Sequence, residues 1–113
     1  MTDSPWSPYE GGASLGQPGS EQGVVVRDEE HELGARITLE RAARAAPFAI
    51  TCGIYGWMMH TRFFSSQDEA ETQYGLMKNS LGALLEAAEQ TAGEDGGRGI
   101  LMEGVEKFVE TYP

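Results

Sequence analysis

Apolar and polar residues alternate along much of the first half of the chain. In residues 33–39 every second position is apolar: Leu33, Ala35, Ile37 and Leu39. This pattern is typical of a strand with one buried face. A valine run at residues 24–26 predicts an earlier strand, and the acidic run at 28–32 predicts a bend between the two. A helix over residues 32–46 is the alternative, because helix formers are frequent there, but its apolar stripe would continue into charged positions.

The next two strands are predicted to form a hairpin. The first begins at Pro47 and has apolar side chains on alternate positions: Phe48, Ile50, Cys52 and Ile54. A two-residue loop at Tyr55 and Gly56 pairs it with a strand over residues 57–64, which leaves His60 and Arg62 on the opposite face. The predicted pairs are Ile54–Trp57, Cys52–Met59, Ile50–Thr61 and Phe48–Phe63. A shift by one or two residues stays open, since Tyr-Gly is not a preferred two-residue turn.

Two helices are predicted after the hairpin. Ser65 or Ser66 supplies the N-cap of the first, and apolar residues then recur at helical spacing as far as Gln90. These residues are Ala70, Tyr74, Met77, Leu81, Leu84, Leu85 and Ala88. A glycine-rich link at residues 93–99 leads to a short final helix over residues 100–111, with an apolar stripe of Leu101, Val105, Phe108 and Val109.

The sequence therefore predicts an α+β fold. Its sheet is a four-stranded antiparallel β-meander with one long helix packed on one face and a short C-terminal helix, in the order β-β-β-β-α-α. Residues 23–113 form a single domain in this prediction. Residues 1–22 are rich in proline, glycine and serine and contain one large aliphatic residue, Leu15, so we expect a disordered N-terminal tail.

Charge and cysteine usage narrow the class of protein. The chain has 113 residues and a formal net charge of −10, which argues against nucleic acid and anionic membrane surfaces as partners. The single Cys52 excludes an internal disulfide framework and a multi-cysteine zinc site. The N-terminus has no signal-peptide pattern, and the uncharged stretch from Ala45 to Met59 is too short and too interrupted to span a membrane. A cytoplasmic protein is predicted.

No motif in the sequence predicts a catalytic, metal or cofactor site. The glycine-rich link does not follow a strand and lacks the Lys-Ser/Thr of a phosphate-binding loop. The run Glu29–Glu32 contains His31, but adjacent residues rarely converge on one ion, so a solvated turn is the preferred interpretation. These observations favour a protein that is not an enzyme.

The sheet face that the long helix leaves uncovered is the most interesting candidate surface. On the predicted register it presents Arg36, Tyr55, Met58, His60 and Arg62. A solvated face, a protein interface and a site for a small anionic ligand are the three interpretations. Aromatic, methionine and arginine side chains are enriched in interfaces, whereas an imidazole between guanidinium groups suits an anion.

The leading hypothesis is a non-enzymatic cytosolic protein-interaction module. It would form a homodimer, or bind another protein, through the exposed sheet face or the terminal helix. The alternative is a small anionic-ligand-binding protein or a minor enzyme with its site around Arg36, His60 and Arg62, in which His60 serves as the general base.

Overall fold

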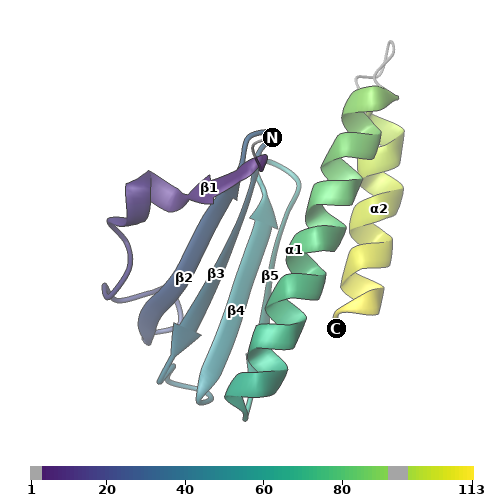
Figure 1. Ribbon diagram of the computed structural model, residues 1–113. Helices are drawn as coiled ribbons and strands as arrows, with labels where there is room; N and C mark the ends of the chain where they lie inside the picture. Colours follow the sequence, from purple (N-terminus) through teal and green to yellow (C-terminus); the bar gives the residue numbers. More distant parts are fainter. Residues whose placement is uncertain (1–3, 92–96) are drawn as a thin grey trace.

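In the computed structural model, which describes residues 4–91 and 97–113, one antiparallel sheet is followed by a long and a short helix (Figure 1). The strands follow chain order in the sheet: β1 Trp6–Pro8, β2 Val24–His31, β3 Ala35–Arg41, β4 Phe48–Ile54 and β5 Met58–Phe64. A short 3-10 helix, η1 Tyr9–Gly12, follows β1, and the chain ends with α1 Gln67–Gln90 and α2 Arg98–Thr111. The predicted α+β meander with a long and then a short helix is confirmed, with five strands in place of four.

The additional strand lies in the segment for which the sequence predicts a disordered tail. We call residues 4–23 the N-terminal segment. In β1, Trp6 pairs with His31 and Pro8 pairs with Glu29. The Trp6 ring lies edge-on to the His31 ring, with their centroids 4.9 Å apart, and its Nε1 lies 3.3 Å from where a Cβ of Gly82 would stand. Trp6 thus fixes the start of the N-terminal segment against the sheet and α1, although the composition of this segment gives little sign of packing.

The acidic run also differs from its prediction as a bend. Residues 28–31 form the second half of β2, and the turn to β3 follows at residues 32–34. The carboxylates are tolerated in the strand because each meets a partner: Asp28 binds Arg36 on β3, and Glu29 accepts a hydrogen bond from Lys78 on α1 at 2.6 Å.

The predicted register of the β4–β5 hairpin is wrong by one residue. Ile54 pairs with Met58 instead of Trp57. The loop therefore has three residues, and Gly56 at its centre has a φ of 80°. A three-residue loop with glycine in the left-handed conformation is a common hairpin connection. Because side chains alternate along a strand, this shift moves every β5 side chain to the face opposite to the predicted one.

The core lies between the sheet and α1. We call the side of the sheet that α1 covers the helix face, and the other side the outer face. The core residues that are almost fully buried are Ile37, Leu39, Ile50, Cys52, Ile54, Tyr74, Met77 and Leu81. Ser66 caps α1, with its hydroxyl accepting a hydrogen bond from the Glu69 amide at 3.2 Å. Of the side chains predicted to point inward, those of Ile50, Cys52 and Ile54 are buried. The exceptions are Trp57, which lies in the loop and is 39% exposed, and the β5 residues that the register shift places on the outer face: Met59, Thr61 and Phe63.

The short helix α2 packs along α1 (Figure 1). Phe108 is buried, and the Tyr112 and Ser80 hydroxyls share a hydrogen bond of 2.7 Å. Most of the predicted glycine-rich link falls in residues 92–96, outside the described residues. Within the described part of the chain, neither helix combines the length and the apolar character needed to cross a bilayer.

Candidate functional site

The five residues predicted to share one surface lie on two sides of the sheet. Arg36 is on the outer face, and Tyr55 lies in the hairpin loop beside it. Met58, His60 and Arg62 lie on the helix face, because they pair with Ile54, Cys52 and Ile50 of the core. The predicted cluster of Arg36, His60 and Arg62 is therefore wrong, and its cause is the one-residue shift of the hairpin.

On the helix face, His60 and Arg62 hold the C-terminal end of the chain. The His60 Nε2 lies within hydrogen-bonding distance of the Tyr112 carbonyl oxygen. The Arg62 guanidinium donates to the Pro113 carbonyl at 3.1 Å and to the Gln73 side chain at 2.7 Å. Both side chains are half-buried. Their polar groups tie β5 to the helical layer, so they are not turned toward solvent on the outer face.

Arg36 is paired with a buried carboxylate. Its Nε and Nη2 donate to the two oxygens of Asp28, at 2.9 and 2.6 Å, and the Tyr9 ring lies over the guanidinium with its centroid 3.6 Å away. Ser14 and Thr38 also donate to Asp28. Burial alone would raise the pKa of Asp28, but the hydrogen bonds from Arg36 and Ser14 and the charge of Arg36 together lower it. The Arg36 charge is thus largely neutralised.

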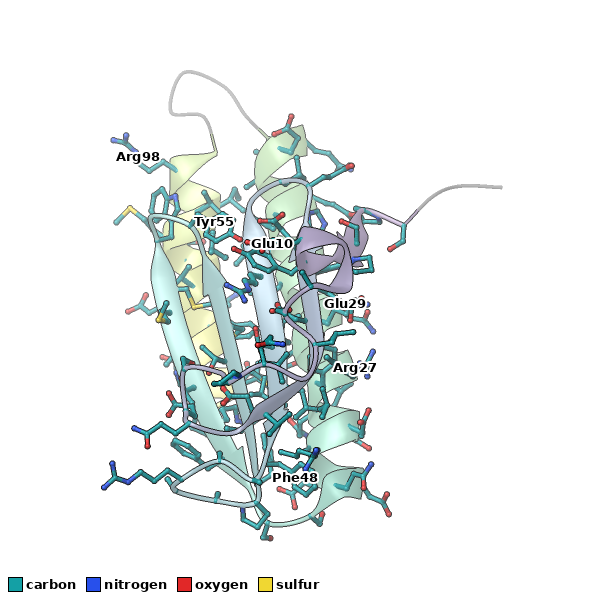
Figure 2. The ribbon with its side chains drawn as sticks, turned by 90° about the vertical axis from the view of Figure 1, so that its left-hand side faces the viewer. Glu10, Arg27, Glu29, Phe48, Tyr55 and Arg98 are labelled. Carbon is teal, nitrogen blue, oxygen red and sulfur yellow. The ribbon has the colours of Figure 1, made fainter. Side chains whose placement is uncertain are left out.

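The N-terminal segment covers the β2–β3 part of the outer face (Figure 2). Glu40, on the outer face of β3, is fully buried. Its carboxylate accepts hydrogen bonds from the backbone amides of Glu21 and Gly23, at 3.2 and 3.0 Å. This carboxylate fixes the N-terminal segment to the sheet.

A cavity of about 600 Å³ opens on the outer face where this cover ends. Residues 18–20 of the N-terminal segment line one side, and residues 55–59 of the hairpin line the other. Arg36, Thr38 and Thr51 are among the residues of the strands between them. Gly53, which pairs with Met59, has no side chain to fill this space.

Large apolar side chains are exposed around the hairpin. Their exposed fractions are 53% for Tyr55, 39% for Trp57, 82% for Met59 and 47% for Phe63. Met59 and Phe63 lie on β5, which has β4 on one side and, within the described residues, no strand on the other. The Tyr55 hydroxyl donates to Glu30 at 2.6 Å, which holds its ring beside the cavity. The edge strand β5 and the exposed apolar side chains therefore lie in the same region of the surface.

The prediction missed Trp57, Met59 and Phe63 as surface residues. A three-residue loop centred on Gly56 would have placed all three correctly, and this glycine was the available signal. The predicted register was preferred because it brought more apolar side chains to one face. In the structure, the polar groups of His60 and Arg62 are tolerated on the helix face because the carbonyl oxygens of Tyr112 and Pro113 lie within hydrogen-bonding distance of them.

Comparisons with protein families, curated proteins and solved structures find no match for this chain. Among the described residues, no group of three histidine, cysteine or carboxylate side chains is arranged to hold a metal ion. The fold and the geometry of the outer face are therefore the basis for a functional proposal.

Proposed function

We propose that this protein is a non-enzymatic interaction module that forms a homodimer by pairing the free edge of β5 with the same edge of a second copy. The observation that carries the proposal is a seven-residue edge strand with exposed Met59 and Phe63. Within residues 4–91 and 97–113 this strand pairs on one side only. An edge strand offers unpaired backbone groups to another chain, and natural proteins usually protect such edges with charges, prolines or short strands.

β5 carries little of this protection. Its sequence, MMHTRFF, has no proline, no carboxylate and no lysine, and Arg62 is its one arginine. The Arg62 guanidinium is directed to the helix face, where it binds Gln73 and Pro113. The outer side of the strand is left with Met59, Thr61 and Phe63, none of which disfavours a neighbouring strand.

The distribution of charge supports the same edge. The chain has a net charge of −10, so two copies repel each other over most of their surfaces. All eighteen acidic residues lie outside residues 48–64, the hairpin that contains β4 and β5. Contact through this hairpin therefore brings two copies together where the repulsion is weakest.

A symmetric antiparallel pairing centred on Thr61 fits the side chains. A two-fold contact places the same patch of each copy against itself. In this register Met59 of one copy lies opposite Phe63 of the second copy, and the two Thr61 residues face each other. Cross-strand pairs of this apolar type contribute roughly 0.2–1 kcal/mol each beyond an alanine pair. The pairing also creates a continuous ten-stranded sheet from two five-stranded ones.

Sedimentation velocity over the micromolar range tests the proposal. We expect the wild-type chain to approach twice its mass of 12.2 kDa as concentration rises. Phe63→Glu should remain a monomer, because its carboxylate would be buried against Met59 of the second copy. Met102→Glu is the matched control, since Met102 is a 60% exposed apolar residue on α2. A monomeric wild type, or a dimer lost equally in both variants, contradicts the proposal.

Cysteine cross-linking tests the register. The native Cys52 is 1% exposed, and burial raises the pKa of its thiol to about 12, so it does not interfere. Thr61→Cys should form an intermolecular disulfide under mild oxidation, because the two positions face each other. Met59→Cys should not, because it faces Phe63 of the second copy. Equal cross-linking of both variants would rule out this register.

We also propose that the protein is located in the cytoplasm and that nucleic acid is not among its partners. The high negative charge and the single buried thiol support that choice. The alternative anion site has lost its geometric basis, because Arg36 lies on the other side of the sheet from His60 and Arg62.

A further inference from the structure

We infer that the outer-face cavity binds an uncharged, mainly apolar small molecule that carries a hydrogen-bond acceptor such as a carbonyl oxygen. Its volume of about 600 Å³ falls inside the range of roughly 300–1,000 Å³ that is usual for ligand pockets. Trp57 and Met59 line the hairpin side, and Val25 lines the sheet below the N-terminal segment. Such a site goes beyond self-association and does not depend on it.

The charges around the cavity exclude a strongly ionic ligand. Arg36 is the one charged residue among its lining residues, and both of its bonds to Asp28 neutralise it. An anion would gain little from this pair and would be repelled by a protein of net charge −10. A cation would find the nearby carboxylates Asp28 and Glu30 already bound to Arg36 and Tyr55.

The polar groups that remain favour an acceptor on the ligand. Arg36 uses Nε and Nη2 for Asp28, and among the described residues its Nη1 has no hydrogen-bond partner. The Thr38 hydroxyl donates to Asp28, and the Thr51 and Thr61 hydroxyls share a hydrogen bond of 3.3 Å. A ligand oxygen near Nη1 would therefore meet a donor without displacing an existing bond, while apolar side chains cover the rest of the molecule.

The two tryptophans provide a direct test. Trp57 lines the cavity, whereas Trp6 lies on the helix face against His31. Nile red, an uncharged aromatic dye with a carbonyl oxygen, is the probe. In an NMR titration of the full chain, we expect the Trp57 indole N–H signal to move with saturation at one dye per chain. The Trp6 signal should stay in place, and Trp57→Phe assigns the two signals.

Variants measured by dye fluorescence complete the test. Thr51→Phe fills the cavity floor and Trp57→Ala removes one wall, and each should weaken Nile red binding by roughly tenfold. Met102→Ala, which changes an exposed apolar side chain on α2, should leave the affinity unchanged. The inference is overturned if the dye does not bind, if Trp6 moves while Trp57 does not, or if Thr51→Phe binds like the wild type.

The same titration in the Phe63→Glu background separates this inference from the dimer proposal. Binding that persists in the monomeric variant supports the cavity as an independent site. Binding that disappears with Phe63→Glu would place the dye at the contact between two copies, which overturns the inference and leaves the homodimer standing.

Discussion

Asp28 shows how a single residue organises the outer face. Its side chain has no exposed surface, yet it receives hydrogen bonds from Arg36, Ser14 and Thr38. A buried carboxylate is tolerated only when it is paired and hydrogen-bonded. Arg36 and Thr38 lie on β3, and Ser14 lies in the N-terminal segment. The hydrogen bonds to the Asp28 carboxylate therefore also hold the N-terminal segment against β3.

The two members of this ion pair should respond differently to substitution. Arg36→Met leaves the buried Asp28 carboxylate without its guanidinium and should lower the free energy of unfolding by about 2–3 kcal/mol. This is less than the roughly 3–5 kcal/mol of a fully buried pair, because the Arg36 side chain is 35% exposed. Asp28→Asn keeps a polar group of similar shape and should cost less. Urea unfolding measures both, and a larger loss for Asp28→Asn would contradict this account.

His31 should make stability depend on pH near neutrality. Its Nδ1 accepts a hydrogen bond from the Leu33 amide, and its buried Nε2 has no partner among the described residues. Burial lowers the pKa of His31 below its ordinary 6.5, against the smaller opposing effect of Glu86 and Glu32. Below that pH the unfolded chain takes up a proton that the folded protein resists, so the free energy of unfolding should fall as the pH drops from about 7.5 to 5.

His31→Phe is the variant that checks this effect. Phenylalanine keeps a ring against Trp6 but does not titrate, so urea unfolding of the variant should vary less with pH over the same range. The lowered pKa values of Asp28 and Glu29 act in a separate window, since their contributions are lost only below their ordinary values of 3.8 and 4.5. An unchanged pH dependence in the variant would show that His31 is not responsible.

At the scale of elements, the two glycines of α1 have different surroundings. A Cβ on Gly75 would meet no atom within 4 Å, whereas a Cβ on Gly82 would lie 3.3 Å from Trp6. Of these two positions, the close contact with the sheet is at Gly82. Gly82 is therefore the position at which α1 accommodates β1.

Alanine substitution should separate the two glycines. Gly75→Ala should raise the free energy of unfolding by up to about 1 kcal/mol, the usual difference in helix propensity. Gly82→Ala has the same propensity gain but crowds Trp6, so its benefit should be clearly smaller. Thermal or urea unfolding of the two single variants gives the comparison, and equal stabilisation would mean that Trp6 moves aside freely.

The elements that the sequence predicted well are those with long, regular patterns. Seven apolar positions at helical spacing and a serine cap specified α1, and strict alternation specified β3 and β4. The hairpin register was not recoverable in the same way, because a loop of two or three residues decides it. Both registers gave β5 a plausible inner face. The glycine at position 56 and the C-terminal carbonyl oxygens that receive His60 and Arg62 favour the observed register.

The N-terminal segment marks a second limit of sequence analysis. Its structure depends on contacts with residues far away in the chain: Trp6 with Gly82, Ser14 with Asp28, and the Gly23 amide with Glu40. None of these contacts leaves a periodic pattern. The candidate cavity depends on this segment for one side, so it could not be predicted while the segment was expected to be a disordered tail.

At the scale of the whole molecule, the acidic residues are unevenly distributed along the chain. The hairpin of residues 48–64 contains no carboxylate in a chain that has eighteen. In the proposed homodimer, the remaining surface would therefore repel a second copy while the β5 edge supplies the apolar contact. Such a balance makes association sensitive to ionic strength, because salt screens repulsion between exposed charges more than it affects apolar contact.

The proposed homodimer should consequently become tighter as salt is added. We expect the apparent dissociation constant from sedimentation to fall when NaCl rises from about 20 mM toward 0.5 M, where the Debye length becomes only a few ångströms. Phe63→Glu should stay monomeric at both concentrations. A dimer that weakens with salt would instead indicate attraction between opposite charges, which the β5 pairing does not contain.

The position of Cys52 turns the only sulfhydryl of the chain into a reporter on the core. Its side chain is sealed between the sheet and α1, and its reactive thiolate form is suppressed at neutral pH. An alkylating reagent can modify it only when the hydrophobic layer opens. The rate of modification in native buffer therefore measures how often the sheet and α1 separate, without any label being introduced.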